Sequence, residues 1–173
     1  SSRRAALASL LAAPAALAQT ITTTSQTTIG FKADTVPERS ECGIGALMPW
    51  ADSLWAVTYN SHMKGTGYGL GLYRIDESLK SERVHVHDGT HANRLIHRES
   101  NQCFIGPYVI DAKGNWKHIP EFDNHRLTST MRHLTDPANR VYYQTMEGQF
   151  LEMDVHEQKP RVLFDVVKEM KLA

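Results

Sequence analysis

Histidine, arginine and tyrosine side chains supply the most evident chemistry in this sequence. His87 and His91 precede Arg94 within residues 87–94, and His125 precedes Arg126 directly. Histidine can take up or release a proton near neutral pH, because its ordinary pKa lies close to that range. An arginine can hold a carboxylate through two parallel hydrogen bonds. The two segments therefore suggest proton transfer on an acidic ligand.

Six side chains are the candidate site residues. The candidate proton carriers are His62, His91 and Tyr108, and the candidate substrate-binding residues are Arg94, Arg126 and His125.

A metal centre is the less favoured interpretation of the histidines. His85 and His87 are two apart on a predicted strand and would face the same side, which suits a metal pair. No third ligand follows at a fixed local spacing, and the HExxH pattern is absent. We expect no metal and no other cofactor, with a divalent ion at this pair as the open alternative.

Composition narrows the class of partner. The chain has 173 residues, of which 41% are hydrophobic, with 19 basic and 19 acidic side chains. These values are typical of a globular protein. A formal charge of zero offers no surplus of cations for binding phosphates, so we expect no nucleic-acid partner.

The N-terminal region has the pattern of an export signal. Two arginines precede an alanine- and leucine-rich stretch that ends in small residues at Ala16 and Ala18. This order predicts a signal peptide over residues 1–18, and hence a periplasmic or extracellular protein with no membrane span after cleavage. Residues 19–42 are expected to form a flexible spacer and the strand that leads into the fold. In an oxidising compartment Cys42 and Cys103 could pair or remain free thiols.

From Gly43 onward the apolar residues alternate with period two, which predicts strands. The strands fall into three sets of four, with blades expected at residues 43–90, 91–124 and 125–168. The first set covers residues 46–48, 54–59, 70–75 and 83–87; the second 95–97, 102–105, 108–110 and 116–119; the third 128–133, 141–146, 150–155 and 161–164.

An acidic residue recurs at the end of the third strand of each set, as Asp76, Asp111 and Asp154. Recurrence at roughly 40 to 50 residues is typical of propeller blades, each a meander of four antiparallel strands. A β-sandwich gives no reason for a landmark on every fourth strand. We therefore predict an all-β chain of about three blades, and interpret the three aspartates as turn residues.

Two segments resemble exported bacterial β-propeller proteins. They are residues 47–55 and residues 130–137, and the likeness extends over about residues 43–164. There is also a distant likeness to propeller polysaccharide lyases and glycosidases. The resemblance implies a ring of roughly six to eight blades and a carbohydrate-active protein, but a propeller fold alone does not determine function.

Propeller geometry would bring the candidates to one face. Loops between second and third strands and loops between blades leave the ring on the same side. His62 lies in the first kind of loop, and His91 and His125 lie in the second. We expect a carbohydrate or protein ligand on this loop face.

Two functions remain open from the sequence. The first is lyase or glycosidase chemistry on an acidic or rhamnose-containing polysaccharide, with a neutral histidine or tyrosine taking the proton. The alternative is a non-catalytic binding or scaffold propeller, which the lack of a tight acid–base motif favours. A quinone-dependent dehydrogenase would need tryptophan docking motifs that the sequence lacks.

Three blades are fewer than the roughly four to eight that a closed propeller uses. We therefore expect the sequence to be a fragment of a longer exported propeller. Intact mass spectrometry of the natural product should give a mass well above 19.5 kDa. A mass near that value would contradict the expectation.

Overall fold

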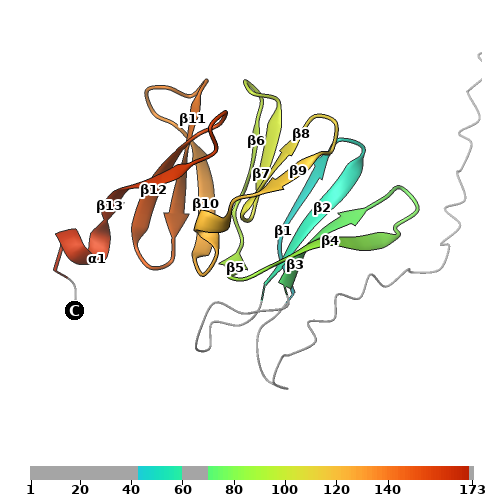
Figure 1. Ribbon diagram of the computed structural model, residues 1–173, viewed down its shortest axis with the longest axis horizontal. Helices are drawn as coiled ribbons and strands as arrows, with labels where there is room; N and C mark the ends of the chain where they lie inside the picture. The colour runs from blue at the N-terminus through green and yellow to red at the C-terminus, as the bar shows by residue number, and fades with distance from the viewer. Residues whose placement is uncertain (1–42, 60–69, 172–173) are drawn as a thin grey trace, which may run out of the picture.

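A computed structural model of the chain describes residues 43–59 and 70–171. They form three β-sheets that stand side by side (Figure 1). The first sheet has the strand order β1-β2-β3-β4, with every neighbouring pair antiparallel. Its strands are β1 (Gly43–Trp50), β2 (Ser53–Tyr59), β3 (Leu70–Ile75) and β4 (Ser81–His87).

The second and third sheets repeat this antiparallel meander. The second contains β6 (Arg94–His97), β7 (Gln102–Ile105), β8 (Tyr108–Asp111) and β9 (Trp116–His118). The third contains β10 (Arg126–Arg132), β11 (Arg140–Thr145), β12 (Gln149–Asp154) and β13 (Pro160–Asp165). A 3₁₀-helix, Pro120–Phe122, joins the two sheets, and α1 (Val166–Glu169) follows β13.

The prediction of a mostly β chain with four-stranded antiparallel units is confirmed, since each predicted set of strands forms one sheet. The linker after β4 differs from the prediction. It contains a short strand, β5 (Thr90–His91), which pairs in parallel with β10 and makes the third sheet five-stranded. The pairing holds because Thr90 donates its N–H to the carbonyl of His125, and Ala92 donates to that of Leu127.

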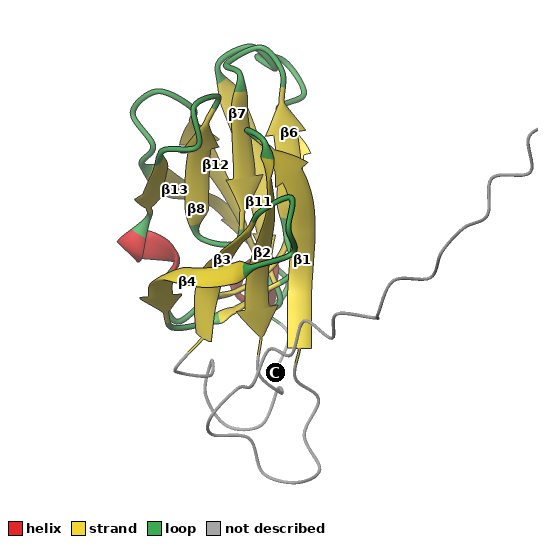
Figure 2. Cartoon of the chain, turned by 90° about the vertical axis from the view of Figure 1, so that its right-hand side faces the viewer, coloured by secondary structure: helices red, strands yellow, loops and turns green. Residues whose placement is uncertain are grey.

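The second sheet lies between the other two in Figure 1, and Figure 2 views the stack from the side of the first sheet. Successive residues of a strand point to opposite faces, so both of its faces must find apolar neighbours. Cys103, Ile105 and Ile110 pack against the first sheet, whereas Phe104 and Val109 pack against the third. The molecule therefore has two apolar cores, one on each side of the middle sheet.

The last residues of β1 and β6 link neighbouring sheets through the N–H groups of their side-chain rings. Trp50, the last residue of β1, donates its indole N–H to the carbonyl of Asp111 at 2.7 Å. His97, the last residue of β6, donates its Nε2–H to the carbonyl of Pro137 at 2.7 Å. The first strands β1, β6 and β10 lie next to one another in sequence order.

The three recurring aspartates are turn residues, as predicted. Each carboxylate accepts backbone N–H groups from the turn that follows the third strand of its sheet. Asp76 accepts from Ser78 and Lys80, Asp111 from Lys113 and Asn115, and Asp154 from His156 and Glu157.

Several sequence predictions fall on residues 1–42 and lie outside the described residues. They are the signal peptide, the spacer and the state of Cys42. Within the described residues, Cys103 is a buried free thiol. The described part of the chain contains no helix with the length and apolar character needed to cross a membrane.

The Trp50 hydrogen bond provides a test of how the first two sheets are joined. Trp50→Phe removes the donor and leaves the Asp111 carbonyl without it, which should cost about 1 kcal/mol of unfolding free energy. The control is Trp116→Phe, because both indoles pack against the same core and that of Trp116 has no hydrogen bond within the described residues. Urea unfolding should show the larger loss for Trp50→Phe, and equal losses would contradict the role of the bond.

Candidate functional site

The hydroxyl of Tyr108 is the centre of a cluster of histidines between the first and second sheets. Tyr108 begins β8, and its side chain is fully buried. Its oxygen lies 3.0 Å from Nδ1 of His85 and 2.9 Å from Nδ1 of His87. Both histidines come from β4, where their spacing of two residues puts them on the face toward the second sheet.

The turn before Tyr108 fixes the position of its ring. Gly106 has a left-handed φ of +55°, a conformation that favours glycine. A Cβ at this position would lie 2.9 Å from Cγ1 of Val57, so the turn is pressed against β2. Tyr108 therefore enters the space between the two sheets directly after a closely packed turn.

His85 forms the open side of the cluster together with His118 and Trp116 of β9. His118 of β9 is the cross-strand neighbour of Tyr108 and donates from Nε2 to a carboxylate oxygen of Asp123 at 2.9 Å. The ring centroids of His85 and His118 are 4.8 Å apart, and those of His85 and Trp116 are 5.0 Å apart. His85, Trp116 and His118 are all partly exposed, so a ligand can reach them.

His91 closes the cluster from behind. Its ring packs edge-to-face on His87 with centroids 4.9 Å apart, and it is fully buried. Its Nε2–H is 3.1 Å from the carbonyl of Asp88, which can only accept, so the proton is on Nε2. Nδ1 of His91 has no hydrogen-bond partner within the described residues.

Burial keeps these groups neutral. It lowers the pKa of His91 to about 3, because a charged imidazole would lose its hydration. The pKa values of His85 and His87 are also lowered, first by burial and then by the neighbouring histidines. Burial raises the pKa of Tyr108. At neutral pH His85, His87 and His91 are therefore neutral imidazoles, and Tyr108 is a neutral phenol.

One hydroxyl between two imidazoles restricts their tautomers. A phenol has a single hydrogen, so Tyr108 can donate to only one of His85 and His87. The other must donate its Nδ1–H to the phenol oxygen. When Tyr108 donates to His87, neutral His85 has its proton on Nδ1 and a free lone pair on Nε2.

The structure distributes the six candidate residues over several places. Tyr108 and His91 belong to the cluster, whereas His62 lies outside the described residues. His125 adjoins the linker, since its carbonyl accepts from Thr90. Arg126 holds Glu147 through Nε at 2.6 Å. Arg94 lines a separate pocket at the first strands.

Sequence reasoning did not select His118 and Trp116, and it considered His85 only as half of a metal pair. The signal for His118 is the short β8–β9 hairpin, which pairs Tyr108 with His118 and Ile110 with Trp116. Cross-strand neighbours in such a hairpin lie on one face, so a histidine opposite a site tyrosine is itself a candidate.

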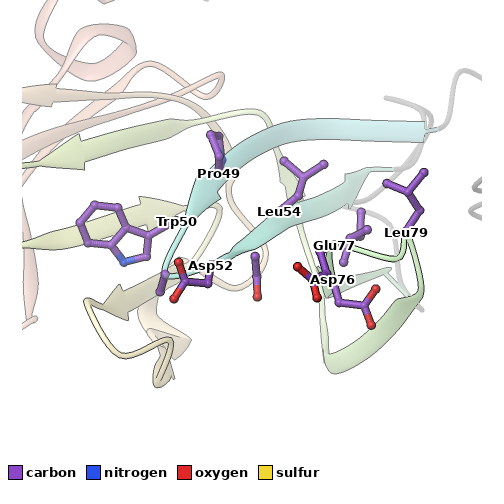
Figure 3. Close-up of a pocket in the computed structure, with 10 residues that line it drawn as sticks. Pro49, Trp50, Asp52, Leu54, Asp76, Glu77 and Leu79 are labelled. Atoms are coloured by element: carbon purple, nitrogen blue, oxygen red, sulfur yellow. The ribbon is translucent and has the colours of Figure 1, made fainter. Parts of the chain in front are cut away.

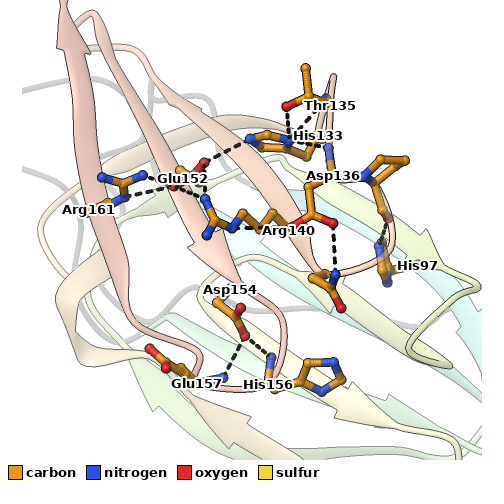
Figure 4. Close-up of polar contacts among 12 residues, drawn as sticks. His97, His133, Thr135, Asp136, Arg140, Glu152, Asp154, His156, Glu157 and Arg161 are labelled. Carbon is orange, nitrogen blue, oxygen red and sulfur yellow. Dashed lines mark hydrogen bonds and ion pairs between the residues drawn. The ribbon is translucent and has the colours of Figure 1, made fainter.

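Two other features of the molecule lie apart from the cluster. A pocket of about 340 Å³ beside the β1–β2 turn includes Pro49, Leu54 and Leu79 and none of the six candidates (Figure 3). In the third sheet, buried Glu152 accepts from His133 and Arg161 (Figure 4). Both carboxylate oxygens of Glu152 accept hydrogen bonds. The network therefore stabilises the third sheet and leaves no free acid or base.

Within residues 43–59 and 70–171, no three His, Cys, Asp or Glu side chains are grouped so that they could hold a metal ion. In the comparisons with known proteins, the chain matches no family model and no curated protein.

The low pKa of His91 predicts a dependence of stability on pH. Below its ordinary pKa of 6.5, His91 binds a proton in the unfolded chain, whereas in the folded protein it stays neutral down to about pH 3. Stability from this group is therefore present above pH 6.5 and lost as the pH falls, by up to about 1.4 kcal/mol per pH unit. His91→Gln, which cannot titrate, should lose less unfolding free energy between pH 6.5 and 4.

The matched control is His156→Gln, because His156 is exposed. Chemical unfolding at a series of pH values should give this control the slope of the unsubstituted protein. An unchanged slope in His91→Gln would show that His91 titrates normally in the folded state.

Proposed function

We propose that this chain is part of an exported β-propeller in which the three sheets are consecutive blades. Four observations support it: each sheet contains a four-strand antiparallel meander, the sheets pack face to face, their first strands are neighbours, and an aspartate turn recurs in each. Three such blades do not close a ring, so further blades complete it in this proposal. The site of action would be periplasmic or extracellular.

We further propose that the protein is a lyase for an acidic polysaccharide. The observation that carries this is the Tyr108 hydroxyl bonded to two neutral histidines, of which His85 is open to solvent. In β-elimination a base removes the proton on the carbon next to a uronate carboxylate. The bond from the neighbouring carbon to the glycosidic oxygen then breaks, leaving a carbon–carbon double bond, and the departing oxygen takes a proton from the imidazolium formed in the first step or from water to become a hydroxyl. A neutral imidazole is suited to the first step at pH 7.

His85 takes the role of the base in this proposal. Its Nδ1 is held by Tyr108, and its Nε2 lone pair is free when Tyr108 donates to His87. Tyr108 is fully buried, so it acts on the substrate through His85 and is a positioning residue. Trp116 offers a partly exposed aromatic surface beside His85, on which a sugar ring can stack.

Glycosidase chemistry fits this site less well. Most glycosidases use two carboxyl groups on opposite sides of the scissile bond. Among the described residues, the carboxylate in contact with the cluster is that of Asp123, and it is engaged by His118. The proton carriers in contact with one another are instead imidazoles and a phenol.

A binding propeller without turnover is the second candidate. The specific observation in its favour is burial, since Tyr108 and His91 have no exposed surface and His87 has almost none. In that case the histidines would be a satisfied polar core, and Trp116 with His118 would form a ligand-binding wall.

His85→Gln separates the two functions. It removes the base while keeping a partly exposed polar side chain, so turnover of uronate polysaccharides should fall at least roughly 100-fold with folding retained. The assay follows unsaturated products and reducing ends on a panel of such polysaccharides. The control is His156→Gln, which should be fully active.

Tyr108→Phe provides a readout that a merely structural residue would not change. Without the hydroxyl, His85 no longer has its tautomer set by a partner, so the pH profile of kcat should shift as well as its maximum. A protein that folds, binds the polysaccharides and releases no product from any of them would favour the binding function.

A further inference from the structure

Exposed apolar side chains lie at the two ends of the stack of sheets. Figure 1 shows the first and third sheets at these ends, so each has an outer face that no described sheet covers. Leu47 and Val86 of the first sheet and Phe164 of the third are between 40% and 49% exposed. The middle sheet has no exposed large apolar side chain, because a neighbouring sheet packs on each of its faces. Each outer face therefore leaves apolar surface in contact with solvent.

A row of side chains across the first sheet shows how such a face is covered inside the molecule. Met48, Trp55 and Arg74 are cross-strand neighbours in that order, and Arg74 pairs with Glu82 at the edge of the sheet. The row lies on the face toward the second sheet, where Trp55 is fully buried.

The third sheet has a row of the same kind on its outer face. Met131, Tyr142 and Glu152 are cross-strand neighbours in that order, and Glu152 pairs with Arg161 at the edge. The residues that alternate with this row pack toward the second sheet, so the row points away from it. Tyr142 has the place that Trp55 has in the first sheet, but it is partly exposed. Both rows face the side of the next sheet in chain order, which indicates that a further sheet packs on the third.

The outer face of the first sheet contains an apolar pocket with an acidic rim. Pro49 and Leu54 are cross-strand neighbours on this face, and the pocket of about 340 Å³ lies between them and the β3–β4 turn (Figure 3). The carboxylates of Asp52, Asp76 and Glu77 also line it, and none of its described lining residues is basic.

The outer face of the third sheet is basic at the corresponding end, beside its own β10–β11 and β12–β13 turns. Arg140 and Arg161 share the buried carboxylate of Glu152 (Figure 4). Arg140 also approaches Asp136 at 3.6 Å, whereas Arg161 has no second ion pair within the described residues and its side chain is 66% exposed. One face therefore has an aromatic row beside a cation, and the other has an apolar pocket beside carboxylates.

We propose that a second copy of this chain covers both outer faces, with the third sheet of each copy packed on the first sheet of the other. A contact between two different surfaces either closes a ring or continues into a filament. Two copies supply six sheets, which is within the roughly four to eight blades of closed propellers, whereas one copy has too few and three have too many. The inference rests on the propeller in the proposed function, whose further blades then come from the second copy, and it does not depend on the lyase.

The oligomeric state of the 173-residue chain is the first measurement. Sedimentation equilibrium over a range of concentrations should give twice the mass of one chain. A monomer at every concentration would overturn the inference, and the proposed propeller would then need blades from a longer polypeptide. A series of ever larger species would also overturn it, because the contact would not close at two copies.

Two substitutions place a charge on each face in turn. Leu47→Glu alters the outer face of the first sheet, and Phe164→Glu alters that of the third, where Phe164 is the cross-strand neighbour of Phe150. Either variant alone should dimerise at least roughly tenfold more weakly, because every contact in its dimer has one altered face. The control is Leu134→Glu on the β10–β11 turn, which is 85% exposed and should remain dimeric.

Mixing the two variants distinguishes this ring from a pairing of like faces. A mixed pair keeps one unaltered contact, between the third sheet of Leu47→Glu and the first sheet of Phe164→Glu. The mixture should therefore form a dimer at concentrations where neither variant does alone, which also shows that both variants fold. If like faces paired instead, one variant would stay dimeric by itself. That result would overturn the inference and count against the propeller, whereas the lyase is tested separately by His85→Gln.

Discussion

Burial of the middle sheet on both faces is the constraint from which the rest of the structure follows. From Cys103 to Ile110 every residue is buried, with alternate side chains in the two cores. A phenol in such a strand cannot reach solvent, so its hydroxyl must find partners inside the protein. For Tyr108 these partners come from β4 of the neighbouring sheet. The packing of the first sheet against the second therefore positions the candidate site.

The same burial determines which residues can meet a ligand. His91 and His87 are held neutral by the loss of hydration, and they support the cluster from within. His85 and His118 have the same chemistry but retain some exposure. All four residues are histidines, so the different roles proposed for them in the lyase follow from how deeply each one is buried.

Sequence reasoning predicted the strands well and the site partly. Period-two alternation and the recurring aspartates predicted the four antiparallel strands in each of the three sheets, since both signals are local. The short β5 was missed, because its pairing with β10 joins segments about 36 positions apart and leaves no local pattern. The prediction selected Tyr108 and His91 but placed no value on His118, whose role depends on the register of β8 with β9.

The position of a residue in a loop indicates less about its contacts than its burial and its ion pairs do. Arg94 and Arg126 are each the first residue of a first strand, and the sequence predicts the same substrate-binding role for both. Glu147, on the turn after β11, engages Arg126, whereas Arg94 faces a pocket. Only the packing of the third sheet distinguishes the two arginines.

The linker between the first and second sheets runs from the histidine cluster to the edge where the first strands meet. His91 lies against His87 of the cluster, and Asn93 lines the pocket at the first strands two residues later. This linker has little freedom to move, because it pairs with β10 on one side and contacts β1 on the other. A Cβ at Gly45 would come within 1.9 Å of the carbonyl oxygen of His91, so β1 approaches the linker as closely as only glycine permits. The segment that supports the histidines of the cluster from behind is therefore held in place by both neighbouring sheets.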